Sequence, residues 1–253
     1  MNLVFVGGDS YFCSHLLRRI FAGSTQILTP PPLQLISAQA RAYSNFQTAE
    51  SFLREYRLTD RDRDELFAQL ILMAPNSLLH QSSARALIES TSENFRFFPM
   101  ISHLIPAGKL VFLVRDGRDV VASLLSSKRM NWGERQNDRP FQIQSLCNYW
   151  LECLHTALQG IGQNSLPASN RSILFYEDFW DETRFLSSVQ SLLPPEVEVL
   201  EEELNRDFEK IDSSEVFRPG TWRSLLSEEE CALVKAEIDE ALASLGYLKR
   251  CPW

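Results

Sequence analysis

The sequence lacks the features that mark membrane, secreted and metal-binding proteins. None of its apolar runs approaches the roughly eighteen residues of a membrane-spanning helix, and no charged and apolar leader precedes the first expected strand. Its five cysteines are scattered, without the paired spacing of zinc ligands, at positions 13, 147, 153, 231 and 251. We therefore expect a cytoplasmic protein with reduced thiols, no bound metal and no membrane contact.

The sequence is also short of positive charge. Its 25 Lys and Arg residues are outnumbered by 33 Asp and Glu residues, which gives a net charge of −8. Binding to nucleic acid needs a basic face that displaces counterions, so the composition argues against extended contact with DNA or RNA. A pocket for a single nucleotide needs only local positive charge.

No linker or internal repeat divides the 253 residues, and the 44% hydrophobic content supplies a sizeable core, so we expect one domain over residues 1–253. Short apolar runs predict strands at Leu3–Val6, Gln26–Leu28, Ala86–Glu89, Leu110–Val114 and Ser172–Tyr176. Helical patterns cover Thr48–Tyr56, Asp60–Met73, Asn94–Leu104, Ser145–Leu158 and the region after Asp181. This alternation predicts an α/β fold with a mostly parallel central sheet flanked by helices.

The strand expected at Leu110–Val114 leads into the strongest functional signal. It runs into the charged turn Arg115-Asp116-Gly117-Arg118-Asp119, after which a helical pattern begins. In an open α/β sheet, ligands bind beyond the carboxyl ends of the strands. Guanidinium groups match phosphate or sulfate oxygens bidentately, and a helix start adds free N–H groups. Ser123 lies about two helical turns after Arg115, where its hydroxyl could face the same anion.

The two arginines of this turn have a second interpretation. Arg115 and Arg118 could form a local network of ion pairs with Asp116 and Asp119, because a cluster of charges after a strand is not specific for ligand binding. The turn taken alone leaves both interpretations open.

The wider sequence resembles the sulfotransferases that use 3′-phosphoadenosine-5′-phosphosulfate (PAPS). The run Val-Arg-Asp-Gly-Arg-Asp-Val-Val-Ala-Ser at 114–123 is similar to the 3′-phosphate-binding motif of that family. Four other parts of the sequence are similar to its first strand and helix, its late strand with Tyr-Glu-Asp, its loop over the 3′-phosphate and its usual ending: Leu3–Gly8 with Leu16–Ile20, Ser172–Phe179, Arg218–Trp222 and Leu245–Tyr247. The resemblance implies a sulfotransferase-like fold related to P-loop NTPases, PAPS as the donor, and adenosine 3′,5′-bisphosphate as the product.

Two segments depart from the family pattern. The first loop of the family carries Arg or Lys, Ser, Gly, Thr and Thr to hold the 5′-phosphosulfate, and of residues 11–15 only Ser14 is chemically similar. Ser90 stands where the family has the Lys of a Glu-Lys-Thr-Pro motif. Backbone N–H groups before the first helix can still hold a phosphate. Arg18 or Arg19 is a candidate for the missing positive charge, the alternative being that both are solvated helix residues.

The resemblance and the chemistry of the side chains together give the candidate site residues. The residues expected to bind the 3′-phosphate are Arg115, Ser123, Arg218 and Gly220, and those expected near the 5′-phosphosulfate are Gly8, Ser10 and Ser14. Removal of a proton from the acceptor needs a base, for which His15 and Glu89 are the candidates. Each also has a structural interpretation, as a helix-surface histidine and as a carboxylate bonded to nearby backbone. His80 is a weaker candidate, and His103 and His155 are expected to be packing residues.

The segment Ser126–Phe141 interrupts the helical pattern after the anion motif. Loops over the carboxyl edge of a sheet often contact ligands. We expect either a lid on the acceptor side, with Trp132 as a packing face, or an ordinary exposed connection.

The leading hypothesis is a sulfotransferase that moves a sulfuryl group from PAPS to a hydroxyl or amine of a small molecule, for example a specialised metabolite. The alternative is a catalytically inactive protein on the same fold that binds a nucleotide or a partner. A nucleotide kinase fits less well, because the sequence lacks a Gly-Lys-Ser/Thr phosphate loop. The sequence does not indicate an oligomeric state.

Overall fold

A five-stranded parallel sheet forms the centre of the protein. The computed structural model describes residues 2–8, 12–32, 34–48, 55–127, 132–162, 166–205 and 218–253. The strand order is β2-β3-β1-β4-β5, and every neighbouring pair is parallel. The strands are β1 (Asn2–Gly8), β2 (Ile27–Leu28), β3 (Ala86–Glu89), β4 (Lys109–Val114) and β5 (Arg171–Phe175). The predicted α/β fold is confirmed, and the five predicted strands agree with these to within two residues at each end.

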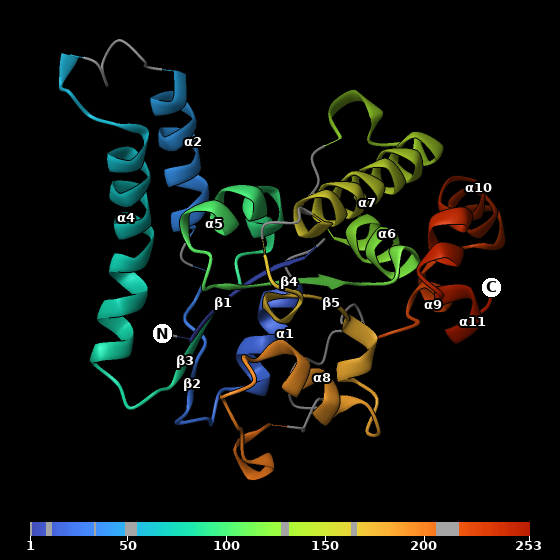
Figure 1. Ribbon diagram of the computed structural model, residues 1–253. Helices are drawn as coiled ribbons and strands as arrows, with labels where there is room; N and C mark the ends of the chain where they lie inside the picture. The colour runs from blue at the N-terminus through green and yellow to red at the C-terminus, as the bar shows by residue number, and fades with distance from the viewer. Residues whose placement is uncertain are drawn as a thin grey trace.

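Helices cover both faces of the sheet (Figure 1). One face carries α2 (Leu35–Thr48), α4 (Asp60–His80), α5 (Phe98–Leu104), α6 (Gly117–Ser126), α7 (Arg139–Gly162) and α10 (Glu228–Ser244). The other carries α1 (Phe12–Ile20) and α8 (Phe185–Leu192). Successive side chains of a strand alternate between the faces, so Leu3 and Phe5 enter the first core while Val4 and Val6 enter the second. No helix in the described part of the chain is long and apolar enough to cross a membrane.

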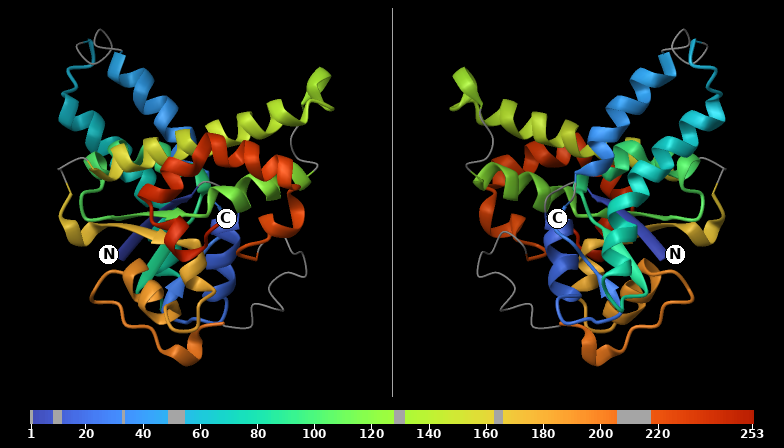
Figure 2. Two further views of the ribbon diagram at one scale, coloured as in Figure 1. Left: turned by 90° about the vertical axis from the view of Figure 1, so that its right-hand side faces the viewer. Right: turned by 90° about the vertical axis from the view of Figure 1, so that its left-hand side faces the viewer.

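Short helices complete the connections. They are the 3₁₀ turns η1 (Ser92–Phe97), η2 (Gly133–Arg135), η3 (Ala168–Asn170), η4 (Tyr176–Phe179) and η5 (Glu201–Glu203), and the single-turn helices α9 (Trp222–Leu225) and α11 (Tyr247–Arg250). Figure 2 shows α2 and α7 rising from one side of the sheet and diverging from each other.

Several helix boundaries differ from the predicted ones for local reasons. The capping box of Thr59 and Asp62 starts α4 at the predicted residue. The helix ends later than predicted, at His80 and not at Met73, because the buried Pro75 lies within the helix and does not end it. Helix α7 extends the predicted Ser145–Leu158 at both ends.

Two further helix predictions need correction, and one helix was missed. The predicted helix at Asn94–Leu104 divides into η1 and α5, with Pro99 in the first turn of α5. Helix α2 was not predicted, and most of the predicted Thr48–Tyr56 lies outside the described residues. The region after Asp181 is helical only in part, because Pro194 and Pro195 follow α8 and interrupt the pattern.

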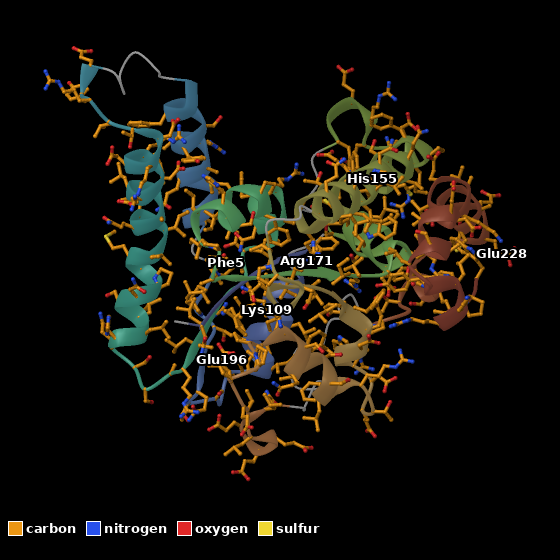
Figure 3. The ribbon with its side chains drawn as sticks, viewed as in Figure 1. Phe5, Lys109, His155, Arg171, Glu196 and Glu228 are labelled. Carbon is orange, nitrogen blue, oxygen red and sulfur yellow. The ribbon has the colours of Figure 1, made fainter. Side chains whose placement is uncertain are left out.

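The amino edge of the sheet is closed by structural contacts. Lys109 begins β4 and lies beside Arg171 at the start of β5, as Figure 3 shows. The Nζ atom of Lys109 donates to the carbonyls of Ser191 and Leu193, both at 2.8 Å, where α8 ends. Burial lowers the pKa of Lys109. These contacts stabilise the C-terminal end of α8. Lys109 therefore has a structural role, and we look for functional groups at the carboxyl edge of the sheet.

Gly7 allows η1 to pack directly on β1. A Cβ atom at this position would lie 2.4 Å from the backbone nitrogen of Phe95, which cannot move without shifting η1. We expect Gly7→Ala to reduce the free energy of unfolding by about 1–3 kcal/mol, as measured by urea denaturation. The matched control is Gly162→Ala, because a Cβ there meets nothing within 4 Å. Equal midpoints for the two variants would contradict the prediction.

Candidate functional site

The carboxyl ends of three central strands bring the main site residues together. In the register of the sheet, Glu89 at the end of β3 is opposite Phe5, and Gly8 at the end of β1 is opposite Leu113. Arg115 follows β4 one residue after its last position. The candidate residues Gly8, Glu89 and Arg115 therefore follow neighbouring strands at one edge, as the sequence predicted.

The helix after β1 carries two further candidates. Ser14 is buried and His15 is half-buried on α1, near the start of the helix. Ser10 lies outside the described residues. Arg18 is half-buried and Arg19 is exposed in the last turn of α1, so their proposed contribution of positive charge remains a prediction.

Arg115 connects three segments of the site. Its side chain is fully buried, and its guanidinium carbon lies 4.9 Å from the centre of the Tyr176 ring. Its Nη2 atom donates to the carbonyl of Arg218 at 3.4 Å. The end of β4, the turn after β5 and the loop containing Arg218 are thus joined at one guanidinium group.

Asp119 holds the loop that follows Arg218. Its carboxylate accepts the backbone N–H groups of Gly220 at 2.7 Å and Trp222 at 2.9 Å, and the hydroxyl of Thr221 at 3.2 Å. Gly220 has φ of +80°, a left-handed conformation that favours glycine. Burial raises the pKa of Asp119, while the charge of Arg115 acts in the opposite direction. The carboxylate therefore clamps the loop beside Arg115.

Arg118 forms the local ion pair that was the alternative interpretation of the motif. Its Nη2 atom lies 2.7 Å from Oδ2 of Asp116, and its Nε atom also donates to that carboxylate. The guanidinium group lies over the ring of Trp222 at 4.6 Å and over that of Trp253 at 4.9 Å. The ion-pair interpretation is thus correct for Arg118 and Asp116, whereas Asp119 binds backbone.

The C-terminal residues cover this arginine. The rings of Trp253 and Trp222 meet edge to face at 5.6 Å, and the indole of Trp253 donates to Asp239 at 2.6 Å. The carbonyl of Cys251 accepts from Arg118 at 2.7 Å, and that of Pro252 accepts from Arg223 at 2.7 Å. The tail thus fixes Trp222, which belongs to the clamped loop. The Trp222 side chain is itself buried.

Glu177 stabilises the turn between β4 and α6. Its Oε1 atom accepts the backbone N–H of Asp116 at 2.9 Å, and its Oε2 atom lies 2.8 Å from the hydroxyl of Tyr247, which is also 3.3 Å from the carbonyl of Val114. Burial and the charge of Asp116 raise the pKa of Glu177 to about 8. The Tyr247 hydroxyl donates to Glu177, so this carboxyl group joins the turn after β4 to the start of α11.

Both carboxylate oxygens of Glu89 accept hydrogen bonds from neighbouring side chains. Its Oε1 atom accepts the Thr91 hydroxyl at 2.5 Å, and its Oε2 atom accepts the side-chain amide of Asn94. The same amide lies 3.2 Å from the carbonyl of Val6 on β1. Asn94 therefore fixes this carboxylate against the first strand.

The remaining candidates lie in varied surroundings. Ser123 is fully buried, and its hydroxyl donates to the Val120 carbonyl at 2.9 Å, so its contact with phosphate remains a prediction. His80 is exposed at the end of α4. His103 and His155 are exposed, so their prediction as packing residues was wrong, and Nε2 of His103 lies 2.8 Å from Asp64.

The predicted acceptor lid is described only in part, because residues 128–131 lie outside the described chain. Trp132 meets the ring of Phe141 edge to face at 6.5 Å, and the guanidinium of Arg135 lies 4.2 Å from that ring. This packing ties the segment to the start of α7. Whether it acts as a lid stays a prediction.

Sequence reasoning missed the roles of Asp119 and Glu177. Asp119 was assigned only to a charge cluster, although its place in the first turn of α6, directly after the charged turn, was a signal for a role at this edge of the sheet. Glu177 was read only as part of a Tyr-Glu-Asp resemblance, and the signal for burial was the aromatic residue on either side of Glu177-Asp178.

The raised pKa of Glu177 predicts a dependence of stability on pH. The pKa rises from an ordinary value of 4.5 to about 8 on folding, so the stabilisation is complete below about pH 4.5 and is lost as the pH rises towards 8. The amide of Glu177→Gln cannot ionise. We expect the stability of this variant relative to the wild type to increase between pH 5 and pH 8, by up to about 1.4 kcal/mol per pH unit. Urea denaturation across this range measures the difference, and a constant difference would refute the assignment.

Removal of the terminal indole should loosen the clamped loop. We expect Trp253→Ala to accelerate hydrogen exchange at the amides of Gly220 and Trp222, because these amides bond Asp119 only while Trp222 keeps its place. Exchange detected by mass spectrometry or NMR measures this. Trp132→Ala is the control, since it removes an indole that packs on α7. Unchanged protection in Trp253→Ala would show that the tail does not position the loop.

Comparisons with known proteins agree with this geometry. No curated protein matches the sequence. Among solved structures, the sulfotransferase domain from the curacin biosynthetic pathway superposes with a TM-score of 0.53 at 15% identity, over 94% of this chain and 97% of that domain, and at this identity the likeness concerns the fold. A family model described as the sulfotransferase family matches residues 9–184, which is more than half of the sequence. The chain therefore belongs to the sulfotransferase family.

Proposed function

We propose that the protein transfers a sulfuryl group from PAPS to a hydroxyl or amine of a small molecule in the cytoplasm. The observation that carries this proposal is the buried Arg115 at the carboxyl end of β4, next to a loop that Asp119 clamps through its backbone. A rigid guanidinium beside a glycine-containing loop suits a phosphate with fixed geometry. Family membership supports the same reaction type.

The chain offers different groups to the two ends of such a donor. Arg115, Arg218 and the backbone at Gly220 would hold the 3′-phosphate, with Ser123 as a further ligand once its hydroxyl turns from Val120. The N-terminus of α1 and the end of β1 at Gly8 would hold the 5′ end through backbone N–H groups. When bound, PAPS supplies the sulfuryl group and a phosphate leaving group.

The chemistry requires a base near the end of β1. In the transfer, the acceptor oxygen or nitrogen bonds to sulfur, the bond from sulfur to the 5′-phosphate oxygen breaks, and the acceptor proton passes to the base. Glu89 is our first choice because Thr91 and Asn94 orient its carboxylate at the end of β3. His15 is the second choice, from its place on α1.

A second candidate function is nucleotide binding without transfer. Two observations favour it. Residues 11–15 contain no Arg or Lys, and both carboxylate oxygens of Glu89 already accept hydrogen bonds. This candidate keeps the 3′-phosphate site and loses the reaction.

The 3′-phosphate site predicts a specific binding pattern. We expect adenosine 3′,5′-bisphosphate to bind more tightly than 5′-AMP, and Arg115→Ala to weaken only the former, by tenfold or more, because it removes a charge-assisted contact worth about 1.5–3 kcal/mol. Calorimetric titration measures both ligands. Arg115→Lys keeps the positive charge but loses the bidentate guanidinium group, so we expect an intermediate affinity for adenosine 3′,5′-bisphosphate.

The outcomes separate the two functions. Binding that depends on the 3′-phosphate and on Arg115, followed by transfer of sulfur-35 from PAPS to an acceptor, would support the sulfotransferase. The same binding with no transfer to any acceptor in a broad panel would support the binding protein. Equal affinity for both nucleotides would refute the site itself.

A further inference from the structure

A cavity of about 730 Å³ lies between α2 and the segment η1–α5, apart from the anion site. Figure 1 shows α2 and α5 side by side over one face of the sheet. The residues that line it are Ala40, Arg41, Tyr43, Ser44, Asn45, Arg96, Phe97, Pro99, Met100 and His103. A concave site of this size with an apolar wall and a few polar groups is typical of small-molecule binding.

The charge of the cavity differs from that of the chain. No carboxylate is among the lining residues, although the whole sequence carries a net charge of −8. Arg41 is exposed on α2. Arg96 pairs with Glu152 at 3.0 Å, but this pair is solvent-exposed and hence weak. Asp64 on α4 bonds the lining residues Tyr43 and His103. The cavity thus combines an apolar wall, from Phe97 and Met100, with the exposed guanidinium group of Arg41.

Two contacts connect the cavity to the proposed site of transfer. The backbone N–H of Gln34, directly before α2, lies 3.4 Å from the hydroxyl of Thr91, which in turn bonds Glu89. Arg41 is seven residues further along, or about 10 Å at the rise of an α-helix. On η1, Asn94 bonds Glu89 while Phe97 lines the cavity. The cavity is therefore formed in part by α2 and η1, two elements that near their first residues also bond the surroundings of the candidate base.

We propose that this cavity binds the distal part of the acceptor, and that the acceptor is an elongated, largely apolar alcohol or amine with an anionic group at its far end. The proposal rests on the proposed function. The reacting hydroxyl or amine lies near Glu89, the apolar body lies against Phe97 and Met100, and the anionic group meets Arg41. Arg41 is then a specificity residue for the anion and takes no part in the chemical step.

The test uses three probes that separate charge from length. They are 10-hydroxydecanoate, which has both the alcohol and the anion, 1,10-decanediol, which lacks the anion, and 4-hydroxybutanoate, which is too short to span the distance. We expect the wild type to bind the first probe more tightly than either of the others in calorimetric titrations. Sulfation of the same probes with PAPS is a separate measurement.

Two variants and a control define the role of the cavity. Arg41→Gln should weaken 10-hydroxydecanoate about threefold to tenfold and leave 1,10-decanediol unchanged, because only the charged contact is lost. Met100→Trp, which fills the apolar wall, should weaken both long probes. Arg85→Gln is the matched control, since Arg85 is an exposed arginine outside the cavity, and should change neither.

The results distinguish this proposal from the proposed function. If the wild type binds the diol as tightly as the hydroxy acid, binds neither, or keeps its preference in Arg41→Gln, the proposed acceptor class is wrong. Titration with adenosine 3′,5′-bisphosphate tests the donor site independently. A protein that binds the hydroxy acid through Arg41 but fails to bind this nucleotide would keep the cavity assignment and lose the sulfotransferase reaction.

Discussion

The burial of two guanidinium groups directly after β4 determines how the carboxyl edge of the sheet is built. A buried charge is costly unless it is paired or hydrogen-bonded, and both Arg115 and Arg118 are fully buried. Arg118 pairs with Asp116 and lies over the rings of Trp222 and Trp253. Arg115 lies against Tyr176 and the carbonyl of Arg218. Each arginine thus requires a segment from the last third of the chain.

The two aspartates of the motif, Asp116 and Asp119, have different structural roles. Asp116 caps the start of α6 and neutralises Arg118, whereas Asp119 bonds the backbone of a loop more than one hundred residues away in sequence. Because the clamp acts through backbone N–H groups, it fixes the path of the loop whatever side chains the loop carries. The C-terminal tail then holds Trp222 from the other side. The candidate nucleotide site is therefore a product of long-range contacts, although its motif is local.

The sequence predicted the sheet well because buried parallel strands leave short apolar runs with sharp boundaries. Leu110–Val114 and Ala86–Glu89 fall within one residue of β4 and β3. Helix α2 was not predicted because it follows Pro30 to Pro32 and its polar face carries few charges. Its absence from the prediction also hid Arg41 and the cavity.

The site was predictable only where a motif carries it. Arg115 and Gly220 could be singled out because each lies in a contiguous motif, and their binding of phosphate stays a prediction. The bond from Asp119 to Gly220, and the cover of Arg118 by Trp253, depend on how distant segments pack, and spacing in the sequence does not encode them. Similarly, the contact of His103 with Asp64 on α4 joins two helices, and periodicity alone cannot assign it.

The distribution of positive charge separates binding from reaction in this protein. In the proposed function, the buried Arg115 would hold the 3′-phosphate, which does not change during transfer. Its contacts would then be equally strong before and during the reaction, and would increase affinity without lowering the barrier. The barrier depends on groups at the sulfur and the leaving oxygen, where residues 11–15 supply no Arg or Lys. In the proposed function, the N–H groups at the start of α1 would supply positive potential in that region, beside any contribution of Arg18 or Arg19. Retention of the 3′-phosphate motif therefore argues for nucleotide binding, and the rate of transfer depends on how well a helix terminus replaces a cationic side chain.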